Sequence, residues 1–151
     1  FLLVRDDNYL AGVIAFIVVQ EMYFLYIMPK HWKVSLIIRA SVFSTISLVA
    51  GLALKVDDIT AYFAIFYFTN LFMNMIDSWI SGKKYLLLSI GLVLFIGCDV
   101  SVGFNNLSSY ISYSSKFIDY MVDFSQLGMW LFYVPSQALI TLSMYFKELY
   151  E

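Results

Sequence analysis

The sequence has little charge and few of the residues that build disulfides or metal centres. Lys, Arg, Asp and Glu make up 13% of its 151 residues, and it holds one cysteine, Cys98, and one histidine, His31. A single cysteine excludes an internal disulfide and a cysteine-based metal cluster. A single histidine, placed in the polar segment Lys30-His31-Trp32-Lys33, excludes a histidine-rich metal site and a Ser-His-Asp catalytic set. We therefore expect neither a metal nor a cofactor.

The sequence also lacks a basic surface and a phosphate loop. Its nine cations and eleven acids give a net charge of −2, and the cations are spread over separate polar segments. Binding to nucleic acid needs clustered Lys and Arg, so nucleic acid is not an expected partner. The absence of a glycine-rich phosphate loop argues against a nucleotide site. Nothing in the sequence indicates an oligomeric state.

Hydrophobic residues, in contrast, make up 62% of the chain. They form runs of about 20 residues, long enough to cross a hydrocarbon core of about 30 Å. Such runs must be helical, because the backbone has no water to bond to there. The predicted spans are Tyr9–Met28, Val34–Leu54, Ile59–Ile80, Tyr85–Phe104 and Leu127–Phe146. The sequence therefore predicts an all-α, polytopic transmembrane helix bundle, with residues 1–151 as one multi-pass membrane domain.

The segments between the spans carry further predictions. Phe1–Val4 reads as the end of an earlier apolar segment, so we expect more spans before Phe1, and residues 5–8 read as a polar loop. Residues 105–115 read as a connection, and Lys116–Phe124 has the spacing of a helix lying in the membrane interface. Pro135 should kink the last span.

The cations predict an orientation. Counting alternate connections, six cations share one side and three share the other. The first side has Lys30, Lys33, Lys83, Lys84 and Lys147, with Arg39 close to it, and the second has Arg5, Lys55 and Lys116. The positive-inside rule makes the lysine-rich side cytoplasmic. The C-terminus is then expected in the cytoplasm and residue 1 on the opposite side.

Asp99 is an acid within an apolar helix, with almost nothing charged for a dozen residues before it. Ionisable residues inside a membrane usually face the protein interior, and many are functional. Loss of water favours the neutral, protonated carboxyl, so Asp99 is a candidate general acid. The alternative is a hydrogen bond between helices.

Other polar residues inside the spans have both functional and structural interpretations. A stripe on one face of the last span is either a cavity lining or packing contact: Gln126, Trp130, Tyr133, Gln137 and Thr141. Asn70, Asn74 and Asp77 form a similar stripe on the third span, where a solvated helix end is the simpler account of Asp77. Arg39 lies about one turn inside its span and could reach the headgroups. Glu21, beside Gln20, needs a neutral state, a wet cavity or a partner, and Arg39 is one possible partner.

Three segments resemble a known family. Gly91-x-x-x-Phe95-x-x-Cys98-Asp99 resembles the Gly-x-x-x-Phe-x-x-Ser-Asp segment of the lysoplasmalogenase-like YhhN membrane family. The segment from Tyr133 to Ile140 resembles its Tyr-x-x-x-Gln-x-Leu-Ile segment. The start of the chain, with Phe1-Leu-Leu, Tyr9-Leu-Ala-Gly12, Phe16 and Tyr23, resembles the stretch after the family's first Gly-Asp motif. The resemblance covers nearly the whole chain in order.

This resemblance implies an eight-helix membrane protein with both termini in the cytoplasm. Family members with known activity hydrolyse the vinyl-ether bond of lysoplasmalogens and release a fatty aldehyde. The family is thought to use two aspartates. Asp99 matches the second, and the first would precede Phe1. Three spans before Phe1 would place this residue outside, as the cations do.

The resemblance makes Asp99 the expected catalytic acid and a lysophospholipid-like membrane lipid the expected partner. Asn70, Trp130, Tyr133, Gln137, Gln20 and Glu21 are the expected substrate-binding residues. We expect Asp99, Tyr133, Gln137 and Asn70 to converge on one cavity open to the outer leaflet or outer face.

The chain departs from the family pattern at two positions. Gln20 stands where the family has His, and Cys98 stands where Ser is usual. Glu21 could replace the lost His as a proton shuttle. The alternative to an enzyme is a non-catalytic relative that binds lipid or regulates a partner. Transport ranks third, since Pro135 is the single mid-span break and the halves show no symmetry.

Overall fold

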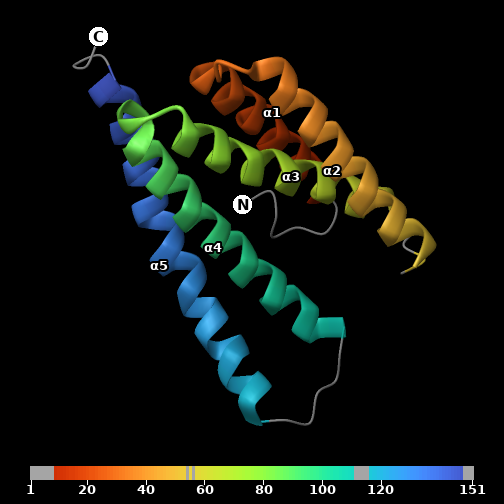
Figure 1. Ribbon diagram of the computed structural model, residues 1–151. Helices are drawn as coiled ribbons and strands as arrows, with labels where there is room; N and C mark the ends of the chain where they lie inside the picture. The colour runs from red at the N-terminus through yellow and green to blue at the C-terminus, as the bar shows by residue number, and fades with distance from the viewer. Residues whose placement is uncertain (1–8, 54, 56, 111–115, 148–151) are drawn as a thin grey trace. The chain divides into compact units, whose positions relative to one another are not determined.

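The computed structural model describes residues 9–53, 55, 57–110 and 116–147 (Figure 1), without the side chains of residues 9, 104–110, 116–124, 126 and 147. Its elements are α1 (Tyr9–Ile27), α2 (Trp32–Leu52), α3 (Ile59–Ile80), the short 3-10 helix η3 (Lys83–Tyr85), α4 (Leu86–Tyr110) and α5 (Lys116–Lys147). Each of the five α-helices contains a stretch long and apolar enough to cross a membrane. The prediction of an all-α, multi-pass membrane protein is confirmed. The predictions for residues 1–8 and 111–115 lie outside the described residues.

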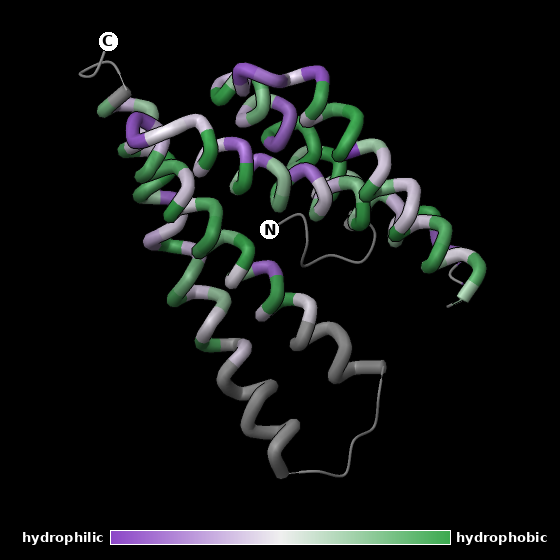
Figure 2. Tube along the Cα trace, in the orientation of Figure 1, coloured by the Kyte–Doolittle hydropathy of each residue, from purple (hydrophilic) through white to green (hydrophobic). Residues whose placement is uncertain are grey.

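Local signals in the sequence account for several helix ends. The carboxylate of Asp58 caps α3 by accepting a hydrogen bond of 2.8 Å from the Thr60 backbone N–H. Beyond the end of α3, Gly82 has a φ of 102°, a conformation that side chains with a Cβ rarely adopt. Figure 2 shows hydrophilic residues gathered where α1 meets α2 and where α3 meets η3, and others along α3, while the other helix bodies are largely hydrophobic. This pattern fits helices whose middle parts lie in lipid.

One predicted boundary is wrong: helix α4 continues to Tyr110, through residues 105–110, which the sequence assigns to a connection. Residues 116–124 are helical as predicted and are the first part of α5, and their place in the membrane interface stays a prediction. The physical reason is that residues 104–110 and 116–126 contain no glycine or proline to end a helix. Helix α5 also runs through Pro135, and the expected kink there stays a prediction.

The chain divides into two compact units, Phe1–Ser81 and Gly82–Glu151, here called the N-terminal and C-terminal units. In the N-terminal unit, α1 and α2 both pack on α3. The rings of Phe16 and Tyr67 join α1 to α3 with centroids 5.8 Å apart, and those of Phe43 and Phe66 join α2 to α3 at 5.3 Å. Helix α3 is therefore the centre of this unit. The prediction of a single domain stays a prediction.

The C-terminal unit is a hairpin in which α4 and α5 lie side by side (Figure 1). Glycines allow the two helices to approach closely. A Cβ at Gly91 would lie 2.8 Å from Ile140 Cγ1 and 3.2 Å from the Ser136 carbonyl oxygen, and one at Gly128 would lie 3.0 Å from Ser101 Oγ. Small residues at such contacts are typical of membrane helix pairs, because close backbones gain van der Waals contact that lipid does not provide.

This packing predicts opposite outcomes for two glycines of α4. Gly91→Leu should lower the free energy of unfolding by about 1–3 kcal/mol or more, because the new side chain has no room. Gly103→Leu is the matched control, since a Cβ at Gly103 meets nothing within 4 Å. It should leave stability unchanged or slightly higher. Thermal unfolding of the detergent-solubilised variants measures both, and equal effects at the two positions would contradict the packing described.

Candidate functional site

A buried arginine organises the polar residues of the N-terminal unit. Arg39 of α2 is 6% exposed, although α2 is otherwise largely apolar and exposed. Its Nε donates to Ser35 Oγ, one turn earlier on α2, at 3.2 Å. Its guanidinium carbon lies 4.6 Å from the centre of the Phe24 ring of α1. Arg39 therefore contacts Ser35 on its own helix, α2, and Phe24 on α1, in addition to its partners on α3.

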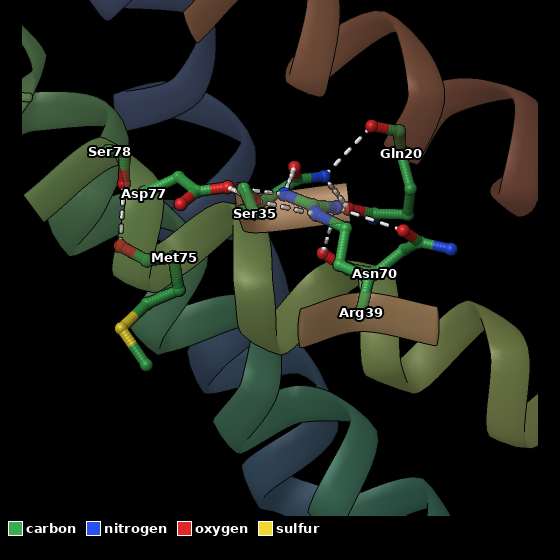
Figure 3. A network of polar contacts seen from close by, with 8 residues as sticks. Gln20, Ser35, Arg39, Asn70, Met75, Asp77 and Ser78 are labelled. Carbon is green, nitrogen blue, oxygen red and sulfur yellow. Dashed lines mark hydrogen bonds and ion pairs between the residues drawn. The ribbon is translucent and has the colours of Figure 1, made fainter. Parts of the chain in front are cut away.

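The main partners of Arg39 are the three polar residues of the stripe on α3. Arg39 Nη1 donates to Asn70 Oδ1 at 2.9 Å, and Nη2 donates to Asn74 Oδ1 at 2.8 Å and to Asp77 Oδ2 at 2.6 Å. Positions i, i+4 and i+7 lie on one helical face, so one guanidinium can reach all three. Figure 3 shows Arg39 among Ser35, Asn70 and Asp77. The ion pair with Asp77 balances the buried positive charge.

Every N–H of Arg39 has an acceptor. A guanidinium has five N–H groups, and the fifth acceptor is the Asn70 carbonyl oxygen, 3.4 Å from Nη1. Ser35 Oγ in turn donates to Asp77 Oδ2 at 2.6 Å. No donor of Arg39 is left for a ligand. We conclude that Arg39 holds α2 against α3 and is not itself a site for an anion.

These contacts correct three expectations. Arg39 does not reach toward the headgroups, and Asp77, 7% exposed, is not a solvated helix end. Each charge alone would be costly inside the membrane, so the two pair with each other across α2 and α3. Arg39 is also not the partner of Glu21, because all its hydrogen-bond acceptors belong to α2 and α3. Glu21 is half-buried.

Gln20 of α1 lies at the end of this network. Its side chain is fully buried, and Asn74 Nδ2 donates to Gln20 Oε1 at 2.9 Å and to the Gln20 carbonyl oxygen at 2.8 Å. Asn74 thus joins Arg39 of α2 to Gln20 of α1. Among the described residues, no acceptor lies within hydrogen-bond distance of Gln20 Nε2. Asn70 and Gln20, two of the predicted substrate-binding residues, therefore belong to one network.

The other predicted site residues lie in the C-terminal unit. Asp99 of α4 is half-buried and follows the buried Cys98. Tyr133 of α5 lies with its ring centroid 6.2 Å from that of Phe95. Trp130 is 70% exposed and Gln137 is half-buried. The face of α5 that packs closely on α4 carries small and apolar residues: Gly128, Phe132, Ser136 and Ile140. Of the predicted stripe, Tyr133 contacts α4 through the ring of Phe95.

The pairing of α4 with α5 sets the depth of these residues. Gly97 lies against Phe132 and Ser101 against Gly128, so Asp99 is level with Trp130. Gly91 lies against Ile140 and Ser136, which places Gln137 about two helical turns, or about 10 Å, further along the hairpin. Asp99 and Trp130 therefore lie at the same level of the hairpin, and Gln137 lies at a different level. The cavity expected to unite Asp99 with Asn70 of the other unit stays a prediction.

Within the described ranges, no three His, Cys, Asp or Glu side chains gather as metal ligands would. Ser35 is the network residue that the sequence interpretation missed. A signal for it existed, since Ser35 precedes Arg39 by one turn on the same face, and a lone cation in one span facing a polar stripe in another suggests a pair.

Comparison with known proteins adds no assignment: neither a protein-family model, nor a curated protein, nor a solved structure matches the chain.

The network predicts a large effect of removing the buried cation. Arg39→Met should lower the free energy of unfolding by about 3–5 kcal/mol, because Asp77 is left buried without its partner. Lys30→Met, at an exposed cation in the connection between α1 and α2, is the control and should change stability little. Thermal unfolding in detergent compares the two variants. An Arg39→Met protein as stable as Lys30→Met would show that the ion pair does not hold the helices together.

Proposed function

We propose that this chain is part of a membrane-embedded hydrolase that cleaves the vinyl-ether bond of lysoplasmalogen-type lipids, with Asp99 as the general acid. One observation carries the proposal. Asp99 is the one carboxylate in the apolar span Lys83–Gly103, and it sits half-buried on a helix held closely against α5. The segments that resemble the lysoplasmalogenase-like family, Gly91 to Asp99 and Tyr133 to Ile140, belong to these two helices and support the same reaction.

The reaction needs a group that releases a proton in an apolar site. The carboxyl of Asp99 transfers its proton to the vinyl carbon remote from the ether oxygen, and the adjacent carbon becomes an oxocarbenium ion. Water adds to this carbon, and its proton returns to the Asp99 carboxylate. The resulting hemiacetal breaks its carbon–oxygen bond to give a fatty aldehyde and a glycerophospho-base. Asp99 ends in its starting state, so no external oxidant or cofactor is needed.

Two kinds of evidence support the residues that we propose to line the substrate site, namely position along the α4–α5 hairpin and the family resemblance. Trp130 lies at the depth of Asp99 along the hairpin, Tyr133 lies about one turn from Trp130, and Gln137 lies further along α5. Asn70, Gln20 and Glu21 are proposed on the resemblance and on their polar character within spans. A lipid substrate reaches such residues from the bilayer, so the partner proposed is a lysophospholipid-like membrane lipid.

A non-catalytic relative that binds lipid or regulates a partner is the second candidate function. The observation that favours it is Gln20, which stands where the family has His. Its amide accepts a hydrogen bond from Asn74 and cannot carry a proton as an imidazole does. If proton transfer in the family needs this His, the present chain keeps the lipid site and loses the reaction.

We also propose that the lysine-rich connections at Lys30–Lys33 and Lys83–Lys84 face the cytoplasm. The distribution of cations supports this orientation. Single cysteines introduced at Lys83 and at Asp57, in a Cys98→Ser background, test it with a membrane-impermeant thiol reagent on intact cells. We expect labelling of the cysteine at position 57 and protection of that at position 83. The reverse pattern would overturn the orientation.

The enzyme proposal predicts loss of activity when the acid is removed. Asp99→Asn in the full-length protein should reduce aldehyde release from a lysoplasmalogen by about 10²–10⁴-fold, the usual contribution of a general acid. Asp57→Asn, at an exposed acid in the connection between α2 and α3, should leave the rate unchanged.

The possible results of this assay separate the alternatives. Activity that survives Asp99→Asn in a folded protein would exclude Asp99 as the acid while keeping the reaction. Absence of aldehyde release by folded wild-type protein, across several headgroups, would favour the non-catalytic lipid-binding relative.

A further inference from the structure

The side-chain amide of Gln20 is a buried hydrogen-bond donor without an acceptor among the residues that the structure describes. Gln20 is 0% exposed, and within the described part of the chain its Nε2 has no acceptor. Buried polar groups are nearly always hydrogen-bonded, so such a group calls for a partner. It lies in a membrane span, seven residues or about 10 Å from the Ile27 end of α1.

The charge of Arg39 decides which atom of Gln20 is left over. An amide can in general be turned so that its oxygen and nitrogen exchange places. Arg39 Nη2 requires an acceptor from Asn74, so Asn74 presents Oδ1 to Arg39 and Nδ2 to Gln20. Gln20 must then present Oε1 to Asn74, because the reverse orientation would place two NH2 groups against each other. The remaining group of Gln20 is therefore the donor Nε2.

We propose that Gln20 Nε2 donates a hydrogen bond to an oxygen of the glycerol backbone of a bound lysophospholipid, and that Asn74 and Arg39 are positioning residues for this donor. The inference rests on the proposed lipid substrate. A ligand that reaches the middle of a span comes from the bilayer and must bring an oxygen acceptor, which an alkyl chain lacks. The phosphate is a poorer candidate, because Gln20 is neutral and the nearby cation Arg39 has no free N–H.

Binding of a saturated alkyl-ether lysophosphoethanolamine tests the donor without any reaction, because this probe has no vinyl-ether bond. With the full-length protein in nanodiscs, we expect Gln20→Leu and the near-isosteric Gln20→Met each to weaken binding about tenfold, the equivalent of one hydrogen bond. Ser47→Ala is the matched control. Ser47 Oγ is also buried without a partner among the described residues, and its removal should leave affinity unchanged.

Asn74→Asp tests the positioning role separately. An aspartate still accepts from Arg39 but has no N–H for Gln20, so the Gln20 amide turns and presents its oxygen to the ligand. We expect Asn74→Asp to weaken the probe about as much as Gln20→Leu, although Gln20 is intact. The double variant Gln20→Leu with Asn74→Asp should be no weaker than either single variant. Additive losses would overturn the positioning role, and if Asn74→Asp fails to fold, the two Gln20 variants decide the proposal.

Unchanged affinity in folded Gln20→Leu and Gln20→Met would overturn the proposal and leave a water molecule or another segment of the protein as the acceptor. Absence of probe binding to wild-type protein would overturn it too. Other results would tell a failure of the proposed function from a failure of this site. Probe binding that depends on Gln20, without aldehyde release from a lysoplasmalogen, would exclude the hydrolase and keep the site. Hydrolysis with an unchanged KM in Gln20→Leu would keep the hydrolase and exclude the site.

Discussion

The ion pair between Arg39 and Asp77 is the interaction on which the N-terminal unit depends. A charge inside a membrane span is tolerated only when its partners replace the water that it has lost. Arg39 meets this condition completely, with an acceptor for each of its five N–H groups, and three of those acceptors are side chains of α3. The pair therefore fixes how α2 is turned relative to α3.

The same constraint extends to α1. Because Asn74 must offer its oxygen to Arg39, its N–H groups bond to Gln20, and the Nε2 donor of Gln20 has no acceptor among the described residues. The C-terminal unit is built differently. There α4 and α5 approach through glycine and serine, and the half-buried Asp99 is carried on a closely packed pair. The N-terminal unit thus holds a network of buried polar side chains around Arg39, and the C-terminal unit carries the half-buried acid Asp99.

The sequence predicts the five spans well because about 20 apolar residues in a row have one stable form in lipid. It also predicts the polar stripe on α3, since helical periodicity defines which residues share a face. A lone cation in one span and a polar stripe in another suggest a pair, but the particular partners of Arg39 and Asp77 do not follow from the sequence. Depth along a span follows from residue number, but the direction in which a side chain points depends on how the helices are turned, which only the packed structure gives.

The helix predicted at residues 116–124 is confirmed, and its place in the membrane interface stays a prediction. Its polar and apolar spacing does not show whether it is separate from the span that follows it. In the structure it is the beginning of α5. At the candidate site, the sequence identifies Asp99 as an acid within an apolar span and, through the family resemblance, Gln20 as a departure from His, while the orientation of the Gln20 amide follows only from the hydrogen bonds of Arg39 and Asn74.

A double-mutant cycle on Arg39 and Asp77 tests the central claim most directly. The free energy of unfolding is measured for wild type, Arg39→Met, Asp77→Leu and the double variant in the same detergent. If the ion pair organises the N-terminal unit, each single variant strands a buried charge, and the double variant is more stable than the sum of the single losses predicts, by up to about 3 kcal/mol. Strictly additive losses would show that the two residues stabilise the helices independently, and would contradict this account.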